Sequence, residues 1–232
     1  MNDLKQMLAD ALRMLERAEV IDFNGHMSCR LPGTDHYLIN SGKSVRSALT
    51  AADIIEIDLD GKTVGTQGVA PHGDRIEQPV PPMEFHIHSE IYRRRPDVNA
   101  VVHTHPVWST LFSMTGEKVL PVTMQAAVMG PIQLFAKTAS INRKPLGEEL
   151  AEALGPHRVV MLKSHGAVVA GADIIEAFVL AIYLEETARR QYMARALGTP
   201  YALTAQEVET IGSNLRKPNL FRKVWDYHHA KL

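Results

Sequence analysis

Two short apolar runs flank Ser164–Gly166, and they constrain the fold of this chain more than any other feature. The runs, Arg158–Lys163 and Ala167–Gly171, are rich in β-branched residues and are each long enough for one strand. Strands joined by so short a connection pair antiparallel, because a parallel pair needs a long crossover. The sequence therefore predicts antiparallel pairing at this point of a sheet.

A long helical segment follows these strands. Asp173 and Glu176 resemble a capping box, and Gly198–Pro200 is a typical helix stop. The sequence predicts a helix from Ile174 to about Leu197. Further helices are expected over about the first 18 residues and at 83–95, 107–114, 145–154 and 204–215, further strands at 37–40, 54–59 and 98–102, and a loop at 66–82.

The order of these elements predicts the fold class. Strands alternate with helices, yet several strands read as hairpins, which favours an α/β fold with a mixed, mainly antiparallel sheet covered by helices. No repeat, low-complexity segment or linker interrupts the pattern, so residues 1–232 are expected to form a single domain.

Charge and cysteine content narrow the functional class. The formal net charge is −1 at pH 7, which argues against nucleic acid or an anionic membrane as the main partner. No apolar run approaches the ~20 residues of a membrane helix, and Asp3 and Lys5 interrupt any signal-peptide pattern. Cys29 is the single cysteine, which suits a reducing cytoplasm.

Three histidines form a candidate metal site. His103 and His105 follow a valine-rich run, and side chains two apart on a strand share a face. His165 follows another β-rich run and precedes Gly166, where a crowded backbone needs a glycine. Three neutral imidazoles match an open catalytic site for a divalent ion. A chance pair at a solvated strand end is the alternative that spacing leaves open.

Glu84 and His88 are one helical turn apart and share a face if the segment is helical. Spacing alone also allows a solvated helix surface there.

The residues also carry a resemblance. The stretches PPMEFHIHSEIYRRRPDVNAVVHTHP, SGKSVRSALTAADIIEIDLDG and LKSHGAVVAGADIIEAFVLAIYLEE resemble the class II aldolase/adducin family, over a region from about Leu4 to Gln191. The resemblance implies an α/β/α sandwich that assembles as a tetramer with active sites between subunits. It also implies that His103, His105 and His165 ligate a metal ion, with Glu84 as a further ligand or as acid/base.

The ligand types favour zinc, while manganese, cobalt, nickel and iron remain open. The expected cofactor is one divalent ion per subunit.

The sequence departs from the sugar-phosphate members of this family. His26 stands where they carry asparagine in the first phosphate loop, and Pro82-Met83 replaces their serine pair, although the Ser41-Gly42 turn is kept. A cationic Arg46 follows that turn, and arginine binds carboxylates with two parallel hydrogen bonds. A small carboxylate therefore fits better than a phosphate ester as the recognised group. The candidate substrate contacts are Gly25, Ser28, Ser41, Gly42 and Arg46.

These departures favour relatives that resemble the dihydroxyphthalate-type decarboxylases. The expected function is decarboxylation of a hydroxylated, aromatic or ring-derived carboxylate through a metal-stabilised enolate. Glu84 or His26 would supply the proton, and Arg46 and Ser28 would orient a second carboxylate. Aldol cleavage of a hydroxy-carbonyl substrate is the alternative, and a non-catalytic adducin-like scaffold is a remote one. The tail at 216–232 is expected to pack at a subunit interface, because it gathers Trp225 and Tyr227.

Overall fold

A computed structural model describes residues 1–65 and 79–232 of the chain. Within these ranges, a seven-stranded sheet runs in the order β3-β2-β1-β4-β7-β6-β5. The strands are β1 (His26–Arg30), β2 (His36–Asn40), β3 (Ile54–Asp58), β4 (Ala100–Thr104), β5 (Ile132–Phe135), β6 (Val159–Leu162) and β7 (Gly166–Gly171). Neighbours pair antiparallel except β5 and β6, which are parallel, so the predicted mixed and mainly antiparallel sheet is confirmed.

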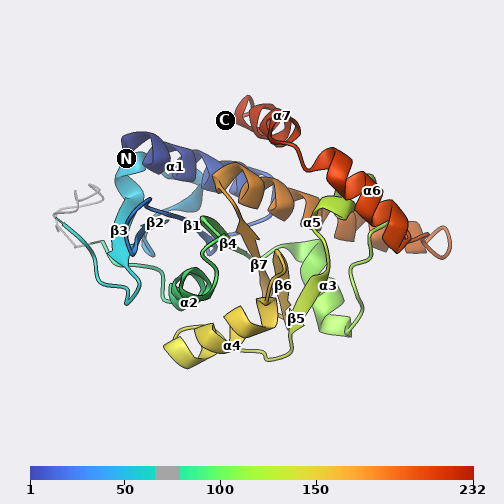
Figure 1. The fold of residues 1–232 in the computed structure, drawn as a ribbon, viewed down its shortest axis with the longest axis horizontal. Coiled ribbons are helices and arrows are strands. Elements are labelled where there is room, and N and C mark those ends of the chain that lie inside the picture. Colours follow the sequence, from blue (N-terminus) through green and yellow to red (C-terminus); the bar gives the residue numbers. More distant parts are fainter. Residues whose placement is uncertain (66–78) are drawn as a thin grey trace.

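Helices cover both faces of the sheet (Figure 1). One face packs against α1 (Asn2–Arg17) and α5 (Ile174–Arg195), and the other against α2 (His86–Arg94) and α4 (Lys144–Leu154). The alternation of side chains along β4 explains the two cores, because Val102 joins the cluster under α1 and α5 while Val101 joins the cluster under α2 and α4. The remaining helices are α3 (Val107–Thr115), α6 (Ala205–Leu215) and α7 (Pro218–His229).

Strand β1 corrects the expectation of a loop at Gly25–Ser28. The chain enters the sheet at His26, and β1 lies between β2 and β4. Met27 and Cys29 belong to the core under α1 and α5, so His26 and Ser28 point to the opposite face, toward α2. A strand is usually recognised in a sequence by alternating apolar and polar residues. In β1 the polar residues His26 and Ser28 are buried as well, so this pattern does not indicate a strand with two buried faces.

Other expected elements shift or appear anew. Helix α2 begins at His86, and Glu84 lies in the turn before it, so the expected shared helical face with His88 is wrong. Strand β5 and helix α7 were not expected, and most of the loop predicted at 66–82 falls outside the described residues. None of the described helices is both long and apolar enough to cross a membrane.

Candidate metal centre

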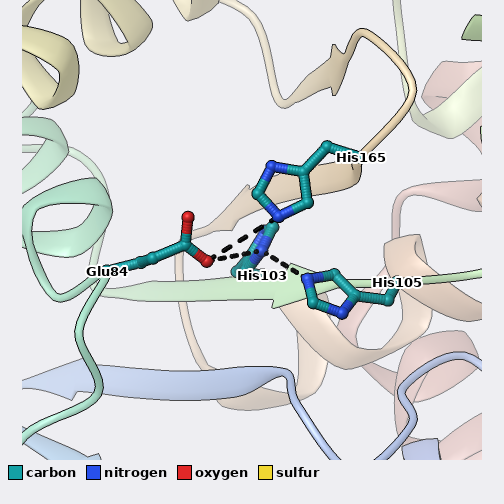
Figure 2. A group of neighbouring side chains, drawn as sticks. All are labelled: Glu84, His103, His105 and His165. Carbon is teal, nitrogen blue, oxygen red and sulfur yellow. Dashed lines mark hydrogen bonds and ion pairs between the residues drawn. The ribbon is translucent and has the colours of Figure 1, made fainter. Parts of the chain in front are cut away.

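Four side chains converge at one end of β4 (Figure 2). Glu84, His103, His105 and His165 each offer a ligand atom, and these atoms all lie within 4.8 Å of one another. His103 is on β4, His105 lies just beyond its end, and His165 occupies the turn between β6 and β7. The pairing of β4 with β7 brings these segments together, because His103 faces Val168 across the ladder.

Each imidazole is oriented by a partner on its Nδ1. His103 Nδ1 lies 3.0 Å from the carbonyl oxygen of Ala167, and His165 Nδ1 lies 3.1 Å from that of Ala139. His105 Nδ1 lies 3.3 Å from a carboxylate oxygen of Asp22. The two carbonyls accept hydrogen bonds from Nδ1–H, and the Asp22 carboxylate favours a proton on His105 Nδ1, so each ring can direct its Nε2 lone pair to the common centre.

Two of the Nε2 atoms lie close enough to share one cation. His105 Nε2 is 3.0 Å from His103 Nε2, and when both rings carry their proton on Nδ1 the two Nε2 lone pairs repel each other. A divalent cation between them removes the repulsion and uses the lone pairs as ligands. The donor set of three imidazoles and one carboxylate therefore fits a divalent metal ion.

Burial keeps these rings in the form that binds metal. Desolvation and the neighbouring His103 lower the pKa of His105 to about 4. Burial, again with His103, also lowers the pKa of His165. Both imidazoles are therefore neutral near pH 7, with a lone pair available for an ion.

The two carboxylate oxygens of Glu84 face different partners. Its Oε1 accepts hydrogen bonds from Ser140 Oγ at 2.9 Å and from the N–H of Ile141 at 2.6 Å. Its Oε2 lies 3.4 Å from His103 Nε2 and 3.7 Å from His165 Nε2. Burial alone would raise the pKa of Glu84, but the histidines and the Ile141 N–H outweigh it and lower the pKa to about 2. Glu84 is thus an ionised carboxylate that can ligate an ion or accept a proton.

Arg46 is enclosed by backbone, which differs from the expected role of orienting a carboxylate. The side chain is 5% exposed. Its Nε donates to the carbonyl of Gly25 at 2.7 Å, and its Nη1 donates to the carbonyls of Ser41 and Ser44. These bonds tie the Gly25 and Ser41 turns together, so Arg46 stabilises the backbone of both turns.

The Ser41-Gly42 turn supports the segment that carries Glu84. Ser41 Oγ and the N–H of Gly42 both donate to the carbonyl of Val80, at 3.2 and 2.9 Å. A Cβ on Gly42 would stand 3.0 Å from the carbonyl oxygen of Pro81, which is tighter than usual contact. Met83, which follows, is 72% exposed.

Gly25 adopts a backbone conformation that favours glycine, with a φ of +84°. A Cβ there would approach Ile21 to 2.8 Å and the carbonyl oxygen of His103 to 3.4 Å. The glycine lets the chain pass beside a metal-site strand.

His26 does not lie alone beside the cluster. It is the register partner of His103 on the neighbouring strand, and the two ring centroids are 5.0 Å apart. Its Nδ1 lies 2.6 Å from His88 Nε2, and His88 Nδ1 lies 2.6 Å from Ser28 Oγ. Ser28 is fully buried, so its side chain, which was expected to contact substrate, faces the protein interior.

A carboxylate on α5 holds the segment that follows His105. The N–H groups of Trp108 and Ser109, at the start of α3, donate to Glu185 at 2.6 and 2.9 Å. A negative charge there satisfies free amides and favours the helix dipole. Glu185 thereby fixes the segment that follows His105 as it leaves the cluster.

A cavity of about 770 Å³ lies elsewhere, among α3, β5 and α6. Its lining is mainly apolar, with Phe112, Met129 and Leu134 as examples, and includes none of the four cluster residues. Its lining contains no histidine, so it cannot supply the imidazole ligands of the cluster.

The sequence alone did not indicate Asp22, Ser140 or Ile141, which orient His105 and Glu84. The contacts of Asp22 and Ser140 arise only when the chain folds, because their partners are distant in the sequence. The contact of Ile141 is made by its backbone N–H, which any residue except proline would supply. His88 could have been recognised as a buried partner, since it lies four residues before Tyr92 on the apolar face of α2.

Known proteins resemble this chain in sequence and in fold. The family profile described as Class II Aldolase and Adducin N-terminal domain matches residues 6–192. An L-fuculose phosphate aldolase of Methanococcus maripaludis is 31% identical over 198 residues, covering 84% of this chain and 99% of the relative. The Decarboxylase NovR of Streptomyces niveus is 31% identical over 183 residues, covering 78% of this chain and 64% of the relative.

A solved structure shares the fold. An L-fuculose 1-phosphate aldolase from Glaciozyma antarctica PI12 superposes with a TM-score of 0.84 and covers 99% of this chain and 88% of its own. At 22% identity, that likeness concerns the fold alone.

Proposed function

The chain belongs to the class II aldolase and adducin family, and from that membership we propose that it is a metal-dependent carbon–carbon lyase that decarboxylates a hydroxylated carboxylate. The observation that carries the proposal is the convergence of His103, His105, His165 and Glu84 within 4.8 Å. A non-catalytic scaffold has no need of such a donor set.

The proposed cofactor is one zinc ion, held by the three imidazoles and Glu84. Bound there, it would act as a Lewis acid that stabilises the negative charge left when a carbon–carbon bond breaks. The carbonyl groups of Ala139 and Ala167 support this role, because they hold two of the rings with Nε2 toward the centre.

In the proposed reaction, Glu84 moves a proton. Its ionised Oε2 faces the cluster and would take the hydroxyl proton of the substrate and deliver it to the carbon that bears the carboxylate, which leaves a carbonyl group in place of the hydroxyl. When carbon dioxide then departs, the electron pair of the broken bond would pass to that carbonyl oxygen as an enolate. Ser140 and Ile141 would hold the other oxygen in place throughout.

Decarboxylation is favoured over cleavage of a sugar phosphate by two positions. His26, which replaces the asparagine of a phosphate loop, is bonded inward to His88. Pro82 and Met83 replace a serine pair and bring no hydroxyl group. A relative named as a decarboxylase, NovR, is consistent with this choice.

The test is a substrate panel with two independent readouts. Purified protein is loaded with zinc, analysed for metal, and offered carboxylated catechols, hydroxy-acids and sugar phosphates while carbon dioxide is measured. Carbon dioxide release from a hydroxylated carboxylate, abolished by a chelator and restored by a divalent ion, is expected. A metal-free protein with full activity would overturn the proposal.

Aldol cleavage is the second candidate, supported by the 31% identical relative named L-fuculose phosphate aldolase. In that reaction Glu84 would take the hydroxyl proton of an aldol substrate. Phosphoglycolohydroxamate and a dicarboxylate discriminate the two as inhibitors. Selective inhibition by the phosphorylated compound would favour the aldolase.

Assembly and location complete the proposal. We infer a homotetramer with active sites between subunits, acting on small molecules in the cytoplasm. The exposed side chain of Tyr227 on α7 supports a subunit contact, and the single, buried Cys29 suits a reducing compartment.

A further inference from the structure

A buried chain of hydrogen bonds runs from α2 to the strand beside the metal site. Tyr92 Oη lies 2.7 Å from Ser28 Oγ, Ser28 Oγ lies 2.6 Å from His88 Nδ1, and His88 Nε2 lies 2.6 Å from His26 Nδ1. Ser28 and His88 are fully buried, Tyr92 is 3% exposed and His26 is 4% exposed. Such a chain is cooperative, and its protons must be arranged consistently from one end to the other.

Tyr92, at the end away from the cluster, determines the direction in which these hydrogen bonds are donated. In the described part of the chain, Tyr92 Oη has no hydrogen-bond partner other than Ser28 Oγ. If Ser28 donated to Tyr92, the phenol O–H would be buried without an acceptor, which is destabilising. When Tyr92 donates to Ser28, every O–H along the chain has an acceptor.

The remaining protons then follow in order. Ser28 Oγ accepts a hydrogen bond from the Tyr92 hydroxyl, so its own O–H donates to His88 Nδ1. His88 must carry its proton on Nε2, from which it donates to His26 Nδ1. A neutral His26 with an accepting Nδ1 carries its proton on Nε2.

We propose that the Tyr92–Ser28–His88 chain fixes His26 as a neutral imidazole with an Nε2–H, and that this N–H donates a hydrogen bond to an oxyanion of the substrate held at the metal centre. Tyr92, Ser28 and His88 are positioning residues in this arrangement. The assignment of the His26 tautomer does not depend on the proposed function, whereas the contact with substrate rests on it. The class of ligand is a carboxylate or another anionic oxygen.

The position of His26 fits a donor to the site. His26 and His103 are directly opposed across β1 and β4, so their side chains leave the same face of the sheet. The other three members of the chain lead away from the cluster, toward α2. A neutral imidazole polarises an oxygen without the solvation cost of a buried cation, and a fixed donor of this kind is worth about 10²–10³ in rate.

The surroundings of Tyr92 favour its role as the first donor. The guanidinium of Arg30 lies 4.6 Å above the Tyr92 ring, where a cation strengthens the phenol as a donor. Burial raises the pKa of Tyr92 well above its usual range, so the proton stays on the oxygen.

The tautomer is measured by two-bond ¹H–¹⁵N correlation of protein labelled at histidine, with His26 assigned from a His26→Asn variant. The expected spectrum has a protonated Nε2 and an unprotonated Nδ1 at His26. Ser28→Ala removes the donor to His88 Nδ1, so it should give a mixture of tautomers. Tyr37→Phe is the matched control, because the Tyr37 hydroxyl bonds to Ser89 and lies outside the chain. A proton on Nδ1 of His26 in the unmodified protein overturns the proposal.

The contact with substrate has its own readout. Oxalate is used as an anionic probe of the zinc-loaded protein, by calorimetry. Ser28→Ala should weaken oxalate binding about tenfold at unchanged zinc content, while Tyr37→Phe should leave it unaltered. Equal affinity in all three proteins overturns the donor role even if the tautomer is as expected. Failure of the carbon dioxide assay would instead overturn the proposed reaction.

Discussion

Gly166 lies so close to Thr104 that a Cβ on the glycine would stand 2.1 Å from the carbonyl oxygen of Thr104. The same Cβ would lie 3.1 Å from Cδ2 of His105. Gly166→Ala must therefore push β7 from β4 or displace the His105 ring. We expect a loss of about 1–3 kcal/mol in the free energy of unfolding and a clear fall in bound metal.

Urea unfolding and metal analysis of Gly166→Ala check this expectation. Gly33→Ala is the control, because Gly33 also changes to a larger residue but has no atom within 4 Å of the added Cβ. Its positive φ costs some stability, yet its metal content should be unaltered. Full metal content in Gly166→Ala would contradict the tight approach of the two strands.

Asp22 should control metal affinity without touching the ion. Its carboxylate lies 3.3 Å from His105 Nδ1, and loss of such a partner usually weakens metal binding about 10–100-fold. Asp22→Asn is therefore expected to lower zinc affinity by about that factor, measured by competition with a chromogenic chelator. Asp10→Asn is the control, since Asp10 contacts His229 at 3.5 Å in a surface pair. Equal affinity of the two variants would refute the role of Asp22.

Glu84→Gln separates chemistry from metal binding. The amide oxygen can still accept from Ser140 and Ile141, so the fold should persist. If Glu84 moves a proton, turnover at saturating zinc should fall about 10²–10⁴-fold and the pH profile should lose one limb. If Glu84 is mainly a ligand, excess zinc should restore the rate. Near-normal turnover at saturating zinc would transfer the proton step to His26.

His88 should make stability depend on pH below neutrality. Burial, with the nearby His103, lowers the pKa of His88 from 6.5 to about 3. Above pH 6.5 the ring is neutral in both states; below it, the unfolded chain binds a proton that the folded chain does not. The free energy of unfolding should therefore fall by about 1.4 kcal/mol for each pH unit between 6.5 and 3 from this group alone.

Urea unfolding of chelator-treated protein between pH 7 and 5 measures that slope. His88→Gln should reduce it, whereas His229→Asn, which removes a half-exposed ring, should leave it nearly unchanged. An identical slope in His88→Gln and the unmodified protein would count against the buried neutral imidazole.

Two aromatic residues on α7 should behave in opposite ways. Trp225 is 4% exposed and packs on Phe178 at 5.4 Å between ring centroids, so Trp225→Ala should cost about 3–5 kcal/mol. Tyr227 is 62% exposed. If α7 reaches a neighbouring subunit's site, Tyr227→Ala should lower turnover and keep stability and metal content. Sedimentation of an active monomer would exclude that arrangement.

The sequence predicted the sheet class and most helices because their apolar periodicity is regular. It missed β1, whose buried polar face comprises His26 and Ser28, because burial of polar groups depends on partners from α2 that a local pattern cannot reveal. It missed α7 although Phe221 and Trp225 are spaced by four residues, because the aromatic and histidine content suggested a tail.

The residue pattern and the family resemblance together indicated the three histidines of the cluster, while the partners of these histidines were not indicated. Ala139 and Ala167 contribute carbonyl oxygens, which any residue would supply, so no side-chain signal exists for them. The surroundings of Arg46 could not be predicted for a related reason, because its charge suggested a contact with a substrate carboxylate, whereas the fold also surrounds it with backbone carbonyls.

The order of strands in the sheet determines how an ion bound at the cluster would act on the whole molecule. His103 and His165 meet only after β4 has paired with β7, and Glu84 joins from the turn before α2. The unfolded chain therefore lacks a binding site of comparable strength, and an ion that binds only the native state shifts the folding equilibrium by mass action. The melting temperature should then rise with the logarithm of the free zinc concentration. The size of that rise would report how strongly zinc binding is coupled to the pairing of β4 with β7.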